Sequence, residues 1–309
     1  MISPSPVAVQ ETLDGTPSSS PRRRLFLWAL YGVSFALLIW FFAEGLQYYM
    51  TPYAERPHHA DYRVFRPAGT HGLTYGIVGA TMMVLMLGYT MRKRTRLLGR
   101  APALRYWLDL HIYFGVIGPL FIVLHTSFKV QGLVAVGFWS MVAVAASGYF
   151  GRYLYMQIPR NIAGNELTLQ EMEQASTHIA DGLKERFRLD DETLKRVDAL
   201  FEKRLIPRRH GALTSALILI GGDLARPFTK RELRRRLRRI ILLPKNQFME
   251  LFETEFRRAL LRRRIGLLSE MRMLFHYWHV IHKPFAIVMY IVMAIHIGVA
   301  LWTGYGWIG

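Results

Sequence analysis

Long apolar runs separated by blocks of arginine and lysine constrain this chain more than any other feature of its sequence. Each run is long enough for a helix, rising about 1.5 Å per residue, to cross a hydrocarbon core about 30 Å thick. The chain is therefore expected to be all-α, a polytopic membrane helix bundle of about five transmembrane helices with a helical cytoplasmic insertion. The five runs are residues 25–45, 72–91, 105–128, 133–156 and 277–303.

The distribution of basic residues predicts how these helices cross the membrane. Basic blocks lie at 22–24, at 92–100 and after the fourth run. Cytoplasmic loops are enriched in Lys and Arg, and five spans with a cytoplasmic N-terminus put all three blocks on that side. The loop 45–71 and the C-terminus then face outward. We expect a multi-pass protein of the inner (cytoplasmic) membrane of a bacterium.

The same distribution argues against a nucleic-acid partner. The formal net charge is +18, but basic residues that flank apolar runs are first a membrane-topology signal. The lipid bilayer is the expected partner instead. The sequence divides into a disordered tail (1–21), transmembrane helices 1–4 (22–159), a basic cytoplasmic helical insertion (160–274), and transmembrane helix 5 with a short outer tail (275–309).

The insertion is hydrophilic, with 25 basic and 16 acidic residues and helical patterns along its length. Its arginine faces suit anionic lipid headgroups, and it would also serve as a docking platform for a soluble partner. The short apolar run ALTSALILIGG at 212–222 is too short to span a membrane, so it is expected to form the core of this domain.

The chain contains no cysteine. Disulfides, thiolate-bound iron–sulfur clusters and the C-x-x-C-H attachment of c-type haem are therefore excluded. Any redox centre must be held without thioether links, and histidine, present eleven times, is the remaining ligand in quantity.

Two predicted spans each carry two histidines fourteen residues apart. His111 and His125 lie on the third span, and His282 and His296 lie on the fifth. Fourteen residues are two heptads, so the second histidine lies about 40° from the first around the helix and about 21 Å along it. A histidine in apolar surroundings is costly unless something binds it.

The predicted topology makes these two spans parallel, so His111 would lie level with His282 and His125 with His296. Facing imidazoles at two depths suit two non-covalent b haems, each with two axial histidines, whereas zinc would need more ligands at one point. His276 and His279 compete for the inner position on the fifth span, but His279 lies about 100° off the face of His296. They would also suit proton or quinone chemistry, or a position at the headgroups.

Neighbouring residues fit such sites without proving them. Gly115 and Gly118 leave helix surface free for a flat macrocycle, although small residues also let membrane helices pack closely. Arg105, Arg152 and Lys283, near the cytoplasmic ends, would neutralise haem propionates or reach lipid phosphates equally well. Asp109 would orient a ligand, relay a proton or pair with Arg105.

These features resemble the di-haem b-type membrane cytochromes. His111-x13-His125, and His282-x13-His296 within WHVIHKPFAIVMYIVMAIHIGVALW, are similar to the ligand pattern of the ferric-reductase-like transmembrane domain and of respiratory cytochrome b subunits. The resemblance implies two stacked haems that pass electrons across the membrane. The chain departs from ferric reductases because no flavin or nucleotide fingerprint is present, and because the insertion is not part of the common pattern.

The leading hypothesis is therefore an electron-transfer subunit of an oxidoreductase rather than a complete enzyme. It would link a cytoplasmic partner or a quinol to an outer-side partner through separate redox partner proteins. Two alternatives belong to other classes. One is a haem-free proton-coupled transporter whose buried histidines relay protons, and the other is a membrane anchor whose insertion recruits a partner protein.

Overall fold

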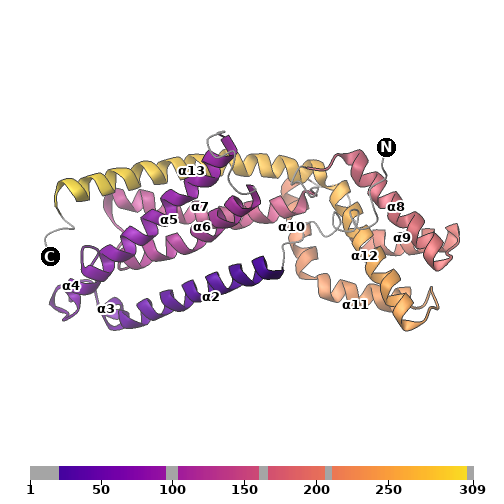
Figure 1. Cartoon of the computed structure of the whole chain (residues 1–309), viewed down its shortest axis with the longest axis horizontal. Helices are drawn as coiled ribbons and strands as arrows, with labels where there is room; N and C mark the ends of the chain where they lie inside the picture. Colours follow the sequence, from indigo (N-terminus) through magenta and orange to yellow (C-terminus); the bar gives the residue numbers. More distant parts are fainter. Residues whose placement is uncertain (1–20, 95–103, 160–165, 206–210, 305–309) are drawn as a thin grey trace. The chain divides into compact units, whose positions relative to one another are not determined.

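A computed structural model describes residues 21–94, 104–159, 166–205 and 211–304 (Figure 1). Every regular element in these ranges is a helix, which confirms the all-α prediction. Five helical segments are long and apolar enough to cross a membrane, as predicted: Pro21–Glu44, Tyr62–Arg94, Leu104–His125, Gly132–Gln157 and Leu268–Trp302. The chain is thus a multi-pass membrane helix bundle. The predicted disordered tail lies outside the described residues except for Pro21, which begins the first span.

Contacts divide the chain into two compact units. The bundle unit contains Ser20–Phe150 and Trp278–Gly309, and the insertion unit contains Gly151–Tyr277. The divisions fall within the fourth and fifth spans. The fifth span is one long helix that starts at Leu268, several residues before the apolar run itself begins.

The bundle unit is built around a helical hairpin of α5 (Thr70–Arg94) and α6 (Leu104–His125), which pack along most of their length (Figure 1). Gly79 and Gly118 face each other in this contact. A Cβ added to Gly79 would lie 2.8 Å from the Ile122 side chain and 3.0 Å from the Gly118 carbonyl oxygen, so a side chain at Gly79 would push the helices apart.

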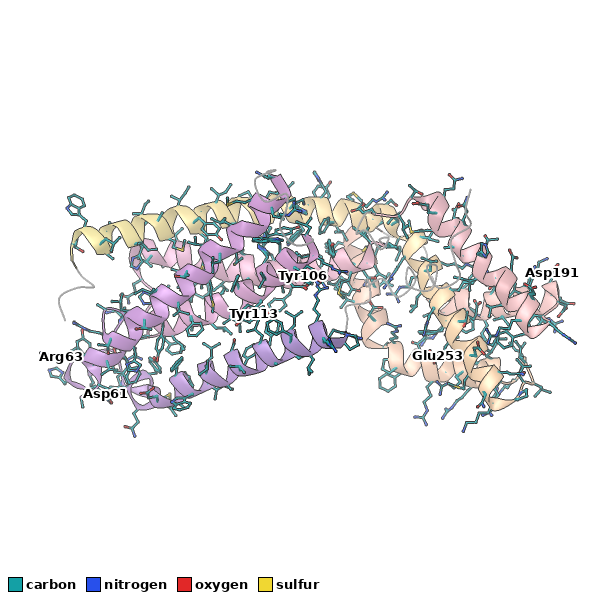
Figure 2. The ribbon with its side chains drawn as sticks, viewed as in Figure 1. Asp61, Arg63, Tyr106, Tyr113, Asp191 and Glu253 are labelled. Carbon is teal, nitrogen blue, oxygen red and sulfur yellow. The ribbon has the colours of Figure 1, made fainter. Side chains whose placement is uncertain are left out.

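Helix α2 (Pro21–Glu44) packs against the other side of α6. The hydroxyls of Ser34 and Tyr113 are 2.6 Å apart, and Arg23 forms an ion pair with Asp109. Figure 2 labels Tyr106 and Tyr113 on this side of α6, and the Arg23 guanidinium lies 4.8 Å from the centre of the Tyr106 ring. Asp109 therefore pairs with an arginine of a different helix, not with Arg105.

The loop between α2 and α5 folds into a cap of three short helices: α3 (Leu46–Met50), η1 (Arg56–His58) and α4 (Tyr62–Phe65). Its centre is the buried side chain of Arg56, which donates hydrogen bonds to the carbonyl oxygens of Tyr49 (2.6 Å), Thr51 (2.9 Å) and Ser127 (2.6 Å). Burial raises the pKa of the Tyr48 and Tyr49 hydroxyls in the same cap. The cap is thus tied to the turn that follows α6.

Helices α7 (Gly132–Gln157) and α13 (Leu268–Trp302) complete the bundle unit. A Cβ added to Gly137 would lie 2.7 Å from the Val292 side chain, so the missing side chain lets these helices approach. Met83, Met141 and Met289 form a buried cluster contributed by α5, α7 and α13. Flexible methionine side chains suit the irregular spaces where helices meet.

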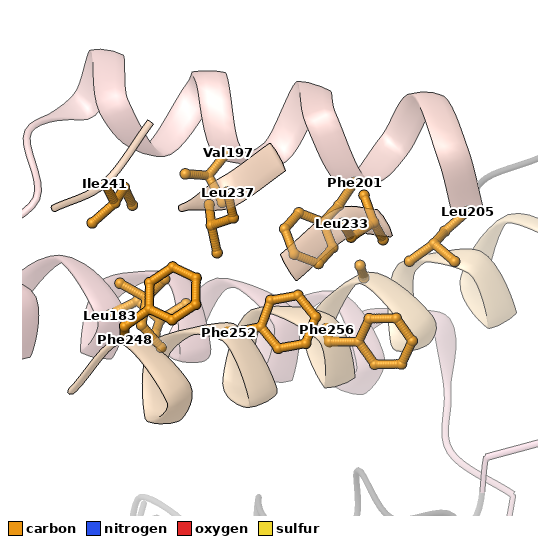
Figure 3. Close-up of a cluster of buried hydrophobic side chains, with 12 residues drawn as sticks. Leu183, Val197, Phe201, Leu205, Leu233, Leu237, Ile241, Phe248, Phe252 and Phe256 are labelled. Atoms are coloured by element: carbon orange, nitrogen blue, oxygen red, sulfur yellow. The ribbon is translucent and has the colours of Figure 1, made fainter. Parts of the chain in front are cut away.

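The insertion unit consists of the ends of α7 and α13 with five further helices: α8 (Leu169–Phe187), α9 (Asp191–Leu205), α10 (Ala212–Leu224), α11 (Arg226–Leu237) and α12 (Lys245–Gly266). Thr168 and Glu171 form a reciprocal capping box that begins α8. Figure 3 shows the core, in which Phe201 of α9, Leu237 of α11 and Phe252 of α12 are among the buried side chains.

The apolar run at 212–222 is not the core of this unit. It forms most of α10, which buries one narrow face through Ala216 and Leu219. Leu213, Leu217 and Leu224 are instead exposed. The expectation was wrong because an apolar run has the same composition whether its face meets a protein core or lipid.

Candidate functional site

The structure brings the four predicted histidines together in two pairs. The ring centres of His125 on α6 and His296 on α13 are 6.2 Å apart. His111 and His282 lie near enough for their rings to interact electrostatically. Because the lower-numbered residues of both helices pair with each other, α6 and α13 run parallel. The two pairs are called the His111 pair and the His125 pair below.

Both histidines of α6 are anchored through the same ring atom to carbonyl oxygens of α5. Nδ1 of His125 lies 2.8 Å from the carbonyl oxygen of Gly72, and Nδ1 of His111 lies 3.3 Å from that of Met86. A carbonyl oxygen only accepts, so Nδ1 carries the proton in each neutral ring and Nε2 keeps its lone pair. Gly72 and Met86 are fourteen residues apart, which repeats the spacing of the histidines along the antiparallel hairpin.

His282 is anchored in the same way by α7. Its Nδ1 lies 2.8 Å from the hydroxyl oxygen of Ser147, and that hydroxyl also lies 3.0 Å from the Val144 carbonyl oxygen. The single hydroxyl proton of Ser147 goes to the carbonyl, so the hydroxyl accepts from His282. The Trp278 indole donates to the Ser147 carbonyl oxygen at 2.8 Å, and its ring centre lies 4.7 Å from that of His282.

This arrangement is the one that metal-binding histidines adopt. A ligating imidazole commonly donates its other N–H to a carbonyl or hydroxyl oxygen, which fixes both the tautomer and the ring orientation. Three of the four histidines have such a partner, and each offers Nε2 as a ligand.

The spacing of the His125 pair fits two axial ligands of one iron. With metal–nitrogen bonds of about 2.0 Å, each ring centre lies about 3.2 Å from the metal, so two rings on opposite sides are about 6.4 Å apart. The observed distance is 6.2 Å, and the planes of the two rings are inclined by 62°. The inclination is compatible with this arrangement because each ring can rotate about its own metal–nitrogen bond.

Within the described ranges, no group of three or more His, Cys, Asp or Glu side chains is placed to hold a metal ion. A zinc site built on four protein ligands has no candidate there. A haem iron takes only two protein ligands, and the residues of each pair supply that number.

Apolar side chains occupy the space between the two levels. Met289 is seven residues from both His282 and His296 and is buried with Met83 and Met141. The Tyr290 hydroxyl donates to the Met83 carbonyl oxygen at 2.6 Å, which joins α13 to α5 at this depth. The two pairs are thus separated by an apolar, methionine-rich layer.

The two predicted glycines face α5. A Cβ on Gly115 would meet the Met86 side chain at 3.4 Å, and one on Gly118 would meet Met82 at 3.3 Å. Close packing of α5 on α6 explains Gly118 without a cofactor. Of the predicted site residues, these two therefore serve the hairpin in this structure.

Of the three basic residues predicted near the sites, Arg105 and Lys283 are at the surface and Arg152 is half-buried. Arg105 is exposed and its guanidinium lies 5.1 Å from the Tyr106 ring centre, while the Arg152 guanidinium lies 5.5 Å from that of Tyr155. Lys283 is exposed beside His282 in the sequence. Exposure of Arg105 and Lys283 is compatible with either propionates or lipid phosphates as their partners.

Of the competing histidines of α13, His279 lies near enough to His282 to interact with it electrostatically. His276 is exposed against Tyr277, and His279 packs against the Trp278 ring at 4.5 Å. On the capped side of the bundle, His71 Nε2 lies 3.8 Å from a carboxylate oxygen of Glu44.

Several residues of the site were not predicted from the sequence. Ser147 and Trp278 fix His282, and Arg56 holds the turn after His125 through the Ser127 carbonyl oxygen. Ser127 and Phe128 in this turn have left-handed backbones (φ 48° and 63°), an uncommon conformation for residues with side chains. No sequence pattern marks these contacts.

Comparison with known protein families, with curated proteins and with solved structures finds no match for this chain. The class that the fold and the site define is therefore a multi-pass membrane helix bundle with two pairs of facing histidines.

Proposed function

We propose that the protein is the membrane subunit of a redox complex, in which each histidine pair holds one non-covalent b haem. His111 and His282 would ligate one, and His125 and His296 the other. A haem held in this way carries one electron at a time. Two such groups at different depths would pass electrons between the two faces of the membrane.

The observation that supports this proposal most strongly is the common anchoring of the histidines. In three of them the Nδ1–H group donates to an oxygen atom. This tautomer leaves the lone pair of Nε2 free to bind a metal. A histidine that relays protons would need Nδ1 to exchange its partner, whereas the carbonyls of Gly72 and Met86 are fixed backbone groups of α5. This favours ligation over the transporter alternative.

Residues around the pairs would orient the rings and exclude water. Ser147 and Trp278 set the His282 ring, and the cluster around Met289 keeps the layer between the pairs apolar. Low polarity and the hydrogen bonds on the axial ligands are the means by which a protein tunes a haem potential.

The partners follow from the predicted topology. The basic blocks support a cytoplasmic N-terminus in a bacterial inner membrane. The His111 pair would then lie toward the cytoplasm and the His125 pair toward the outer side, beneath the cap. A separate cytoplasmic redox protein, or a quinol near His276 and His279, would exchange electrons at the first pair, and an outer-side protein at the second.

Proteoliposomes test this function directly. The purified protein is reconstituted into vesicles that contain oxidised cytochrome c, and dithionite is added outside. The proposal predicts reduction of the enclosed cytochrome c at a rate proportional to protein content. His125→Ala protein and protein-free vesicles should show only the slow background rate. Equal rates with wild-type and His125→Ala protein would contradict the proposal.

A further inference from the structure

Helix α10 exposes a row of leucines in the insertion unit. The exposed fractions of Leu213, Leu217 and Leu224 are 67%, 63% and 76%. Spacings of four and seven residues place all three on one face of the helix. The opposite face is buried through Ser215, Ala216 and Leu219.

The row lies in the segment 213–242, which carries most of the exposed large apolar side chains of helices α8 to α12 and is called the patch below. Between residues 166 and 267, as far as the structure describes them, Leu169 is the sole exposed large apolar side chain outside the segment 213–242. The other helices of the unit bury their apolar faces in the core shown in Figure 3. An apolar patch of this kind on an otherwise well-packed unit marks an interaction surface.

The end of α10 is fixed beside the end of a membrane span. Asp223 accepts hydrogen bonds from the Tyr153 hydroxyl at 2.8 Å and from the Gln157 amide at 3.1 Å, both in the last turns of α7. Arg263 of α12 donates to the other oxygen of Asp223 at 2.7 Å. Because α7 crosses the bilayer, its last turns lie at the membrane boundary, and α10 ends beside them.

The helix that follows adds positive charge to the patch. Phe228, Arg231 and Arg235 lie on one face of α11, and together with Arg239, just past the end of the helix, they line a shallow surface hollow. No ion pair to these three arginines is seen in the described part of the chain. By contrast, Glu232 in the same hollow is paired with Arg204 and Arg236. The charge of the three arginines therefore remains available to an anionic partner.

We propose that α10 and α11 form an interfacial membrane anchor, in which the leucine face of α10 lies among the lipid chains and the arginine face of α11 binds anionic headgroups. Helices that lie in the membrane interface combine an apolar face with Lys or Arg in this way. The occupant is the bilayer itself because the unit enters from one span and leaves into another, so lipid is always within reach.

A fluorescence experiment on the full-length protein tests this proposal. The chain has no native cysteine, so Leu213→Cys, Leu217→Cys and Leu224→Cys can each carry a single environment-sensitive fluorophore. Leu169→Cys is the matched control, an exposed leucine of the same unit outside the patch. The proteins are placed in nanodiscs of phosphatidylcholine and phosphatidylglycerol, each containing one copy of the chain.

The anchor predicts that brominated lipids quench the labels at 213, 217 and 224 strongly, and that iodide in the buffer does not. The label at 169 should behave in the opposite way. Iodide quenching at all four positions would overturn the proposal. So would protection from iodide without quenching by brominated lipid, because protein would then cover the face.

The arginine face is tested with a label at Phe228→Cys. Replacing Arg231, Arg235 and Arg239 with Gln should make this label accessible to iodide, and omitting phosphatidylglycerol should have the same effect. The control replaces Arg188 and Arg196, on other surfaces of the unit, and should change nothing. If the label in the triple variant stays protected from iodide, the three arginines do not bind anionic headgroups.

Discussion

The Nδ1 atom of His282 lies 2.8 Å from the hydroxyl oxygen of Ser147. Ser147 is 135 residues earlier in the chain and belongs to the neighbouring helix α7. The Ser147 hydroxyl donates to the Val144 carbonyl oxygen, so its oxygen accepts a hydrogen bond from Nδ1–H of His282. The ring is thereby held in the tautomer that leaves Nε2 free. The same tautomer results at His111 and His125 from backbone carbonyls.

Replacing Ser147 with alanine should therefore loosen the haem that we propose for the His111 pair. Loss of an outer partner of a metal ligand commonly lowers affinity by about 10–100-fold. We expect Ser147→Ala protein to lose part of one haem during purification and to show a shifted midpoint potential for the remainder. Ser140→Ala, a buried serine of the same helix, is the control. Identical haem content and potentials in both variants would contradict the assigned role of Ser147.

The pairing of the histidines predicts which substitutions are equivalent. His125→Ala and His296→Ala should remove the same haem, and His111→Ala and His282→Ala should remove the other. Redox titration followed at the α-band would show one missing component in each case, shared within a pair. His276→Ala should retain both. A different grouping of the four variants would show that the pairs are wrongly assigned.

Arg56 is predicted to support the capped end of the bundle. Its guanidinium donates to three carbonyl oxygens, and Arg56→Gln would leave buried acceptors unpaired at a cost of about 3 kcal/mol. Hydrogen exchange should rise across the cap and in the turn after His125. Arg63→Gln, an exposed arginine of the same cap labelled in Figure 2, should leave exchange unchanged. Unchanged exchange in Arg56→Gln would refute this role.

The stability of the insertion unit should depend on pH through Glu255. Burial raises the pKa of this carboxyl to about 7, with Asp198 adding to the shift and Arg258 opposing it. Between the usual 4.5 and about 7, the folded state holds a proton that the unfolded state releases. The free energy of unfolding therefore falls as pH rises through this window, by about 3 kcal/mol for this one group.

Glu255→Gln should flatten that decline. Urea unfolding of the full-length protein can be followed by thiol labelling of a buried Ala259→Cys site, measured from pH 4.5 to pH 7. Glu250→Gln, an exposed carboxylate of the same helix, should keep the wild-type slope. If Glu255→Gln also keeps it, the proton is not held by Glu255.

Much of the bundle could be predicted from the sequence. Apolar length gives the spans, and the two fourteen-residue spacings place His111 with His282 and His125 with His296. The anchoring of these rings could not be predicted. Gly72 and Met86 act through backbone carbonyls that every residue has, so no side-chain pattern marks them.

Two other features escaped prediction for different physical reasons. Arg56 was missed because a charged residue in a polar loop is expected to be solvated, whereas three carbonyls around it make burial favourable. The exposed leucines of α10 were missed because composition does not distinguish an apolar face that is buried in protein from one that is exposed. The structure distinguishes the two because the neighbouring helices bury their apolar faces in the core, whereas α10 leaves its leucines exposed.

The central claim is tested most directly by the haem content of the purified protein. Pyridine haemochrome analysis with a reduced-minus-oxidised spectrum should give two b haems per chain and an α-band typical of two axial histidines. Protein that is folded in the membrane, binds no haem and shows no reducible band would contradict the account.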